Sequence, residues 1–231
     1  ADVTVLARRA DVLAALANEL PPSHAAQRHG FLVADVADTE TLRREVDELV
    51  AAHPVHILIN NSGGPPPGDI ATAEPAAFLD AYRRHLRANQ TLAQAVLPGM
   101  RAAGWGRIVN IISTSVKEPI ADIGVSNATR GAVANWAKTL AGEVAADGIT
   151  VNNVLPGSTD TPRIAQIVAA KAQASGRSTL DVQQAMAAAI PMGRFADPAE
   201  TAAAVAFLAS PAASYITGIN LPVDGGRTRS L

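Results

Sequence analysis

The sequence predicts an α/β fold, in which a parallel sheet lies between two layers of helices in an α/β/α sandwich. Short runs rich in β-branched residues alternate with stretches of helical periodicity, which is the pattern of repeated βα units. The runs are apolar throughout, so both faces of the sheet should be covered by helices. A chain of 231 residues with this pattern is expected to form a single domain with a doubly wound sheet.

The alternation places the elements along the chain. The expected strands are residues 3–6, 31–36, 55–60, 107–112, 149–155 and 219–223. The expected helices are residues 10–20, 39–52, 75–103, 124–146 and 198–209. Residues 158–194 break the alternation, because this stretch is long, polar at its start and helical in its middle. We interpret it as a lid or substrate loop.

Composition excludes several classes of protein. The formal net charge of −2 argues against a nucleic-acid-binding surface. The absence of cysteine excludes disulfides, thiolate zinc sites and cysteine nucleophiles, and no metal site is expected. No run approaches the roughly 18 apolar residues of a membrane span, and no secretory leader is recognisable. We therefore expect a cytoplasmic protein that binds neither nucleic acid nor membranes.

Polar or Gly/Pro-rich residues follow most of the expected strands, where parallel sheets bind their ligands. They are Arg8 and Arg9, Asp35 and Val36, residues 60–67, residues 113–115 and residues 156–162. A crevice lined by these residues would suit a polar, extended ligand such as a nucleotide.

Several segments occur in a characteristic order and spacing. They are Asn60-Asn61-Ser62-Gly63, the run ending in Ser113, the run ending in Pro156-Gly157, and residues 215–226. Together they resemble the short-chain dehydrogenase/reductase family, and within it the β-ketoacyl-acyl-carrier-protein reductase-like members. The resemblance implies a Rossmann-type fold with a seven-stranded sheet, NADP or NAD as cofactor, and hydride transfer to or from a carbonyl. It also implies a small carbonyl or acyl substrate, and a homodimer or homotetramer paired through residues 75–103 and 124–146.

The resemblance also assigns cofactor contacts. They fall on Asp35, Val36, Asn60, Asn61, Ser62, Gly63, Arg130, Pro156, Gly157, Thr159 and Thr161. Arg8 and Arg9 lie where the family reads the adenosine ribose, and arginine there suits a 2′-phosphate, which favours NADP over NAD. The alternative for this pair is two solvated arginines after a strand. The alternative for Asp35 and Val36 is a turn before a helix that starts at Asp38.

The catalytic residues depart from the family pattern. Ser126 and Arg130 stand where the family has its tyrosine and its lysine. A serine hydroxyl is far less acidic than a phenol, whose pKa is about 10, so a proton would have to come through water. Arg130 can bind ribose hydroxyls but cannot shuttle a proton. Ser113 is retained as the hydroxyl that orients the substrate, or else it is a strand-end serine that caps a loop.

His85 stands where the family has an asparagine. With an ordinary pKa of about 6.5, a histidine there is a candidate replacement acid. The alternative, which we favour because the register rests on counting, is a partly exposed helical histidine beside several arginines.

The sequence contains no glycine-rich phosphate loop of the kind that binds a dinucleotide. Its first strand corresponds to the second strand of the family, so the first βα unit is missing. Without that central strand, two buried edges would carry unpaired backbone groups, at a cost of about 1–3 kcal/mol each. We therefore expect this chain to be incomplete at its N-terminus.

Two functions follow from these observations. The first is an NADP-dependent carbonyl reductase or alcohol dehydrogenase, in which Ser113 orients the substrate, Arg130 holds the ribose, and a water near Ser126 or His85 delivers the proton. The second is a nucleotide-binding or assembly homologue with little or no turnover, which the loss of the tyrosine favours. An enzyme of other chemistry that reuses the pocket is a third possibility.

Overall fold

The structure is a computed structural model that describes residues 1–230. Its strands are β1 (Thr4–Ala7), β2 (Gly30–Val33), β3 (Ile57–Asn60), β4 (Gly106–Ile111), β5 (Ile149–Pro156) and β6 (Asn220–Val223). Its helices are α1 (Ala10–Glu19), α2 (Thr39–Ala52), α3 (Pro75–Tyr82), α4 (Ala88–Ala103), α5 (Gly124–Val144), α6 (Pro162–Ser175), α7 (Thr179–Ala188) and α8 (Pro198–Ala209). The expected α/β fold is confirmed, and each expected strand and helix has a counterpart.

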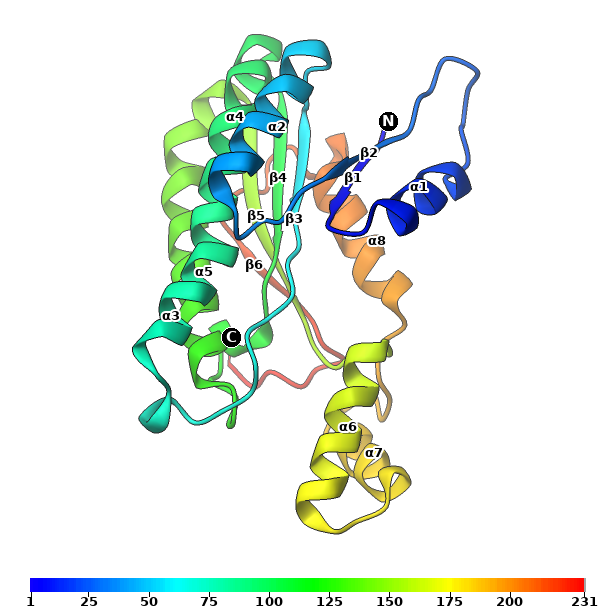
Figure 1. Cartoon of the computed structure of the whole chain (residues 1–231), viewed down its shortest axis with the longest axis vertical. Coiled ribbons are helices and arrows are strands. Elements are labelled where there is room, and N and C mark those ends of the chain that lie inside the picture. Colours follow the sequence, from blue (N-terminus) through cyan, green and yellow to red (C-terminus); the bar gives the residue numbers. More distant parts are fainter. Residues whose placement is uncertain (231) are drawn as a thin grey trace.

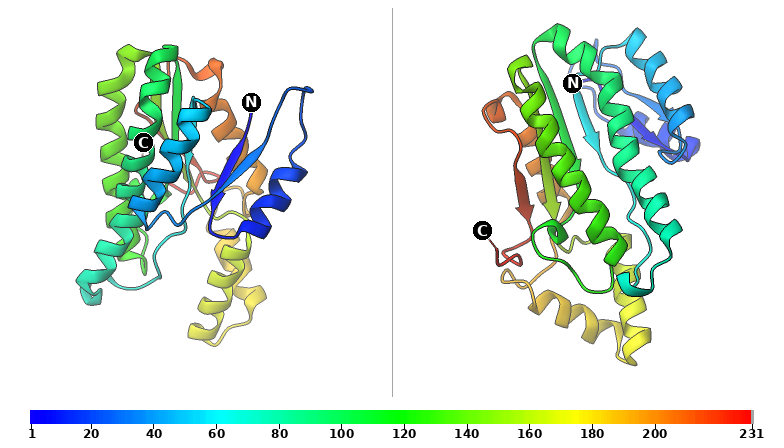
Figure 2. Two further views of the ribbon diagram at one scale, coloured as in Figure 1. Left: turned by 45° about the horizontal axis from the view of Figure 1, so that its top comes forward. Right: turned by 90° about the vertical axis from the view of Figure 1, so that its left-hand side faces the viewer.

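The strands pair in parallel but form two separate sheets. One has the order β1-β2, and the other has the order β3-β4-β5-β6. Helices α2, α4 and α5 cover one face, while α1 and α8 lie on the other, so the three-layer arrangement is present (Figures 1 and 2). The resemblance implied one continuous seven-stranded sheet. Within residues 1–230, the facing edges of β1 and β3 are instead not paired with each other.

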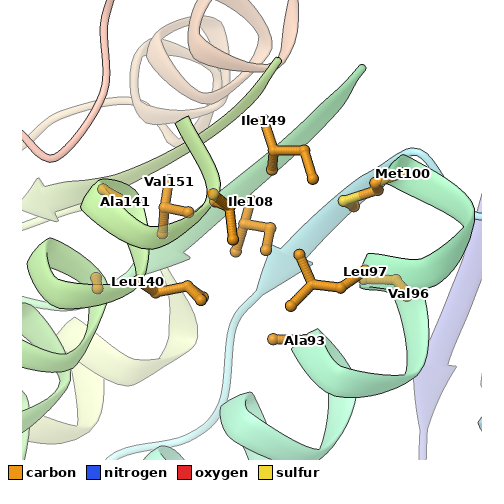
Figure 3. Packing of buried hydrophobic residues seen from close by; sticks show 11 residues of the cluster. Ala93, Val96, Leu97, Met100, Ile108, Leu140, Ala141, Ile149 and Val151 are labelled. Carbon is orange, nitrogen blue, oxygen red and sulfur yellow. The ribbon is translucent and has the colours of Figure 1, made fainter. Parts of the chain in front are cut away.

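The main core lies between the larger sheet and helices α4 and α5. Leu97 and Met100 of α4 and Leu140 of α5 point toward Ile108 and Val151 on the strands (Figure 3). Burying a large apolar side chain stabilises the fold by about 1.5–3 kcal/mol. The small side chains of Ala93, Ala137 and Ala141 complete the cluster and leave room for both helices to lie close to the sheet.

The predicted helix over residues 75–103 is interrupted. A π-turn at Arg83–Arg87 separates α3 from α4. Such a turn adds one residue to a helical turn and therefore changes which side chains face inward. His85 lies on this turn and is 2% exposed. A periodicity argument that assumes 3.6 residues per turn cannot place a side chain that follows such an insertion.

Residues 158–194 form a helical hairpin that projects from the sheet (Figure 1). Helices α6 and α7 pack on each other through Val168, Ala172, Val182 and Met186. The base is closed by a parallel bridge between Thr159 and Ala196. The hairpin therefore has its own small core. No helix in the described part of the chain combines the length and apolarity needed to cross a membrane.

A row of asparagines crosses the larger sheet. Asn60, Asn110, Asn153 and Asn220 are successive partners in the strand register. Their side-chain amides form a chain of hydrogen bonds of 2.8, 2.9 and 2.8 Å, each donated toward β6. At the β3 end, the Oδ1 of Asn60 is buried and accepts no hydrogen bond from any described residue. The asparagine row therefore ends at β3, an edge strand of the larger sheet, with the Asn60 Oδ1 as an unused acceptor.

Replacing Asn110 with alanine should destabilise the domain strongly, because Asn110 is fully buried and bonds both neighbours in the row. The change leaves the Asn60 amide and the Asn153 carbonyl without partners, which should cost about 3 kcal/mol. Urea unfolding of Asn110→Ala measures this loss, and Asn135→Ala on the exposed side of α5 is the control. Equal stability of the two variants would contradict the role of the row.

Candidate active site

Ser113 lies two residues after the end of β4, at the carboxyl end of the larger sheet. Its hydroxyl oxygen accepts the N–H of Ser115 at 3.1 Å, which starts the short helical turn Thr114–Val116. Because the oxygen acts as acceptor in this contact, its proton stays available for a second hydrogen bond. Ser113 thus caps a loop, as one interpretation expected, while retaining a donor for a substrate oxygen.

Arg130 connects two strand ends. It lies one helical turn after Ser126 in α5 and is only 8% exposed. Its guanidinium donates to the carbonyl of Ile111 at the end of β4 (2.9 Å) and to the carbonyl of Ser62 after β3 (3.3 Å). Burial lowers the pKa of Arg130 to about 10, so it remains a cation at neutral pH. No carboxylate among residues 1–230 forms an ion pair with it.

His85 lies against the same loop. Its Nδ1 is 2.6 Å from the hydroxyl oxygen of Ser62, and its Nε2 is buried without a partner in the described chain. Burial, followed by the charges of Arg130 and Arg84, lowers the pKa of His85 to about 4. The favoured interpretation of a partly exposed histidine is therefore wrong, because the π-turn directs this side chain inward. At neutral pH the imidazole is uncharged.

The loops that follow β3 and β5 also lie at the carboxyl end of the larger sheet. A Cβ added to Gly63 would meet no atom within 4 Å, so that glycine borders open space. At Gly157, a Cβ would lie 2.8 Å from the Cα of Asp224, so only glycine fits that turn. Thr159 and Thr161 bond back to carbonyls of their own loop at 3.4 and 3.3 Å. Asn61 is exposed, and Pro156 is half-buried.

The remaining candidates, which were predicted to contact the adenosine, follow the strands of the smaller sheet, β1 and β2. Arg8 and Arg9 are exposed at the end of β1. Asp35, after β2, accepts the N–H of Ala37 at 2.9 Å and lies 3.9 Å from Arg84. Val36 packs into the cluster of α2 and α4. The predicted adenosine-side and nicotinamide-side residues thus belong to different sheets.

Sequence reasoning missed the Ser62 contacts. The sequence does show that Ser62 replaces the alanine of the family's Asn-Asn-Ala-Gly segment, which adds a hydroxyl where the family has a methyl group. Its partner could not be found from the sequence, because His85 is 23 residues away and its direction depends on the π-turn. The sequence does show an asparagine in each of the expected strands 55–60, 107–112, 149–155 and 219–223, and this recurrence could have predicted the asparagine row.

The lowered pKa of His85 makes stability depend on pH. Since the unfolded imidazole has a pKa of about 6.5, its protonation opposes folding as the pH falls from 6.5 through 4, by up to about 3 kcal/mol. His85→Gln should lose this part of the acid sensitivity, whereas the exposed His24→Gln should retain it. NMR titration of the His85 ring should give a midpoint near 4; an ordinary midpoint would contradict the buried placement.

Comparison with known proteins gives the family. A family profile described as enoyl-(acyl carrier protein) reductase matches residues 1–228. A putative ketoacyl reductase of Streptomyces coelicolor is 35% identical over 189 residues, covering 79% of this chain and 72% of that protein. Galactitol 2-dehydrogenase of Cereibacter sphaeroides is 34% identical over 231 residues, covering 99% and 85%.

Solved structures agree with these relatives. L-Sorbose reductase of Gluconobacter frateurii, complexed with NADPH and L-sorbose, has a TM-score of 0.91 and 30% identity, over 100% of this chain and 88% of that one. YwfH, an NADPH-dependent reductase involved in bacilysin biosynthesis, has a TM-score of 0.92 and 27% identity, over 100% and 89%. The chain belongs to the ketoreductase-like members of the short-chain dehydrogenase/reductase family, a family of NAD(P)-dependent oxidoreductases.

Proposed function

We propose that the protein is an NADP-dependent reductase that transfers a hydride between the nicotinamide and a carbonyl or secondary alcohol, as 3-oxoacyl reductases do. The observation that carries the proposal is the buried cation of Arg130, held between the end of β4 and the loop after β3. This cation lies at the edge of the sheet where Ser113 presents its hydroxyl. Parallel sheets of this class bind ligands at that edge.

The chemistry is divided among a few side chains. When bound, the reduced cofactor supplies the hydride. Ser113 donates a hydrogen bond to the carbonyl oxygen and orients it. Arg130 stabilises the negative charge that develops on that oxygen, since a fixed cation acts strongly where water is excluded. Ser126, whose hydroxyl is too weak an acid to act alone, orients the water that gives the proton.

His85 has a positioning role in this proposal. With a pKa of about 4, almost none of it is protonated at neutral pH, so it is a poor general acid. Its hydrogen bond to the Ser62 hydroxyl fixes the loop whose carbonyl Arg130 also holds. The hydrogen bond between His85 and Ser62 therefore connects the turn between α3 and α4 to the loop after β3, which is proposed to bind the cofactor.

The cofactor fits the chain in part. The nicotinamide side would be held by Arg130 and by residues of the loops after β3 and β5. These loop residues are Asn60, Asn61, Ser62, Gly63, Pro156, Gly157, Thr159 and Thr161. Asp35 and Val36 would border the adenine, and the exposed Arg8 and Arg9 would bind the 2′-phosphate. Residues 1–230 provide no glycine-rich turn for the pyrophosphate.

We therefore propose that a further strand and helix occupy the interval between β1 and β3 in the working protein. β1 and β3 each have an edge without a ladder partner, and a parallel strand between them would pair the backbone groups of both edges. The unused Oδ1 of Asn60 can accept a donor from such a strand. Ile59, Phe31 and Val33, which are 40–44% exposed, are the apolar surface that a helix would cover.

A second function has a specific observation in its favour. The replacement of the family's tyrosine by Ser126 removes the usual acid, and a nucleotide-binding or assembly homologue would not need one. Such a protein would bind NADPH without reducing any carbonyl. The two functions therefore differ in turnover and not in cofactor binding.

Turnover by the full-length protein separates them. We expect NADPH oxidation with β-keto esters or quinones, and Ser113→Ala should lower kcat/KM by about a hundredfold, as the loss of a hydrogen bond made in the transition state does. The exposed Ser214→Ala is the control and should retain activity. NADPH binding without turnover, combined with activity that appears in Ser126→Tyr/Arg130→Lys, would support the inactive homologue. Absence of NADPH binding would contradict both functions.

The preference for NADP depends on Arg8 and Arg9. Replacing both with alanine should raise the Kd for NADPH by about tenfold, because charge-assisted bonds to the 2′-phosphate are lost. The Kd for NADH should hardly change, since NADH has no such phosphate. Fluorescence titration with both nucleotides measures the two constants, and the exposed Arg177→Ala is the control. An equal change for both nucleotides would mean that the arginines do not read the phosphate.

The subunit state and location complete the proposal. We infer a homodimer or homotetramer paired through α3, α4 and α5, because Leu79 and Tyr82 of α3 are 69% and 49% exposed. Light scattering of the purified protein gives the subunit number. The proposed location is the cytoplasm, where a soluble dinucleotide is available to the enzyme.

A further inference from the structure

The chain after β6 folds into a tight turn. Asp224 accepts hydrogen bonds from the N–H of Gly226 (3.0 Å) and from both the N–H and the hydroxyl of Thr228 (2.8 and 2.6 Å). Gly225 and Gly226 have φ values of 65° and 84°, which favour glycine. These contacts give residues 224–230, here called the C-terminal tail, a defined path.

The tail contacts the loop after β5 and the end of the projecting hairpin segment. The close approach of Asp224 to Gly157 leaves no room for a side chain at the latter. Gly225 accepts the N–H of Met192 at 3.2 Å, and a Cβ on Gly225 would lie 2.8 Å from Ile190. The tail therefore lies between the Pro156-Gly157 turn and the return from α7.

The far end of the tail is bound by a single carboxylate. One oxygen of Glu118 accepts the N–H of Arg229 at 2.6 Å and the N–H of Ser230 at 2.8 Å. Glu118 itself bonds the carbonyl of Thr114 through its own N–H, in the turn that Ser113 caps. The carboxylate thus joins the loop of the substrate-orienting serine to residues more than 110 positions later.

We propose that Glu118 is a positioning residue for substrate binding, and that the tail it holds is a wall of the substrate subsite. The proposal deepens the proposed reductase function and rests on it. The tail joins the Ser113 loop, the Pro156-Gly157 turn and the return from α7. The first two segments follow the carboxyl ends of β4 and β5, where parallel sheets bind their ligands. Carboxylate-to-amide bonds are charge-assisted and hold backbone geometry closely.

The test is a cycle of variants in the full-length protein. Glu118→Ala should raise the KM for the carbonyl substrate by about tenfold, the order of a lost charge-assisted pair, while the Kd for NADPH stays within about twofold. A chain ending at Thr228 should show the same increase, and adding Glu118→Ala to it should cause no further change. Glu118→Gln, which retains an acceptor oxygen, should lie between. The exposed Glu143→Ala is the matched control.

A second readout does not need turnover. Hydrogen exchange of the Arg229 and Ser230 amides should be slow in the parent protein and fast in Glu118→Ala. An unchanged KM in an active Glu118→Ala enzyme, or additive effects in the double variant, would overturn the role of Glu118. An inactive parent protein would overturn the reductase function and the substrate role together, whereas equal exchange in both proteins would overturn the contact itself.

Discussion

The edge of a β-strand carries backbone N–H and C=O groups without a ladder partner, and within the described chain β1 and β3 each have such an open edge. The residues proposed for the adenosine follow β1 and β2, and those proposed for the nicotinamide follow β3, β4 and β5, so the two groups belong to different sheets. The proposed strand between the sheets would set the distance between them. Both parts of this chain align with solved family structures over its whole length.

On the nicotinamide side, two polar systems hold the strand ends together. The asparagine row joins β3 to β6 through side chains, close to where Ser113 and the Pro156-Gly157 turn leave the sheet. Arg130 then bonds two carbonyls just beyond the row, at the ends of β3 and β4. Arginine suits this position because its planar group donates in several fixed directions, which a lysine ammonium cannot do. Arg130 thus forms a rigid connection between the ends of β3 and β4.

Much of this fold was predictable from the sequence because local patterns determine it. The strand runs and the helix over residues 39–52 follow from apolar periodicity, and the Asp38 cap that starts this helix bonds the N–H of Thr41 at 3.1 Å. The interrupted sheet agrees with the missing glycine-rich turn. The direction of His85 was not predictable, since a π-turn has no clear sequence signal. The Glu118 contact joins residues far apart in the chain, so no local pattern contains it.

The proposed strand and helix between β1 and β3 would complete the cofactor site. A strand-turn-helix unit that carries a glycine-rich phosphate-binding turn can be joined to the N-terminus of the 231-residue chain, and both proteins titrated with NADPH. A matched extension with its glycine-rich turn replaced by alanines separates added stability from phosphate binding. Only the unmodified extension should bind NADPH tightly, while both extensions should slow hydrogen exchange along β3. Equally tight NADPH binding by the 231-residue chain alone would contradict this proposal.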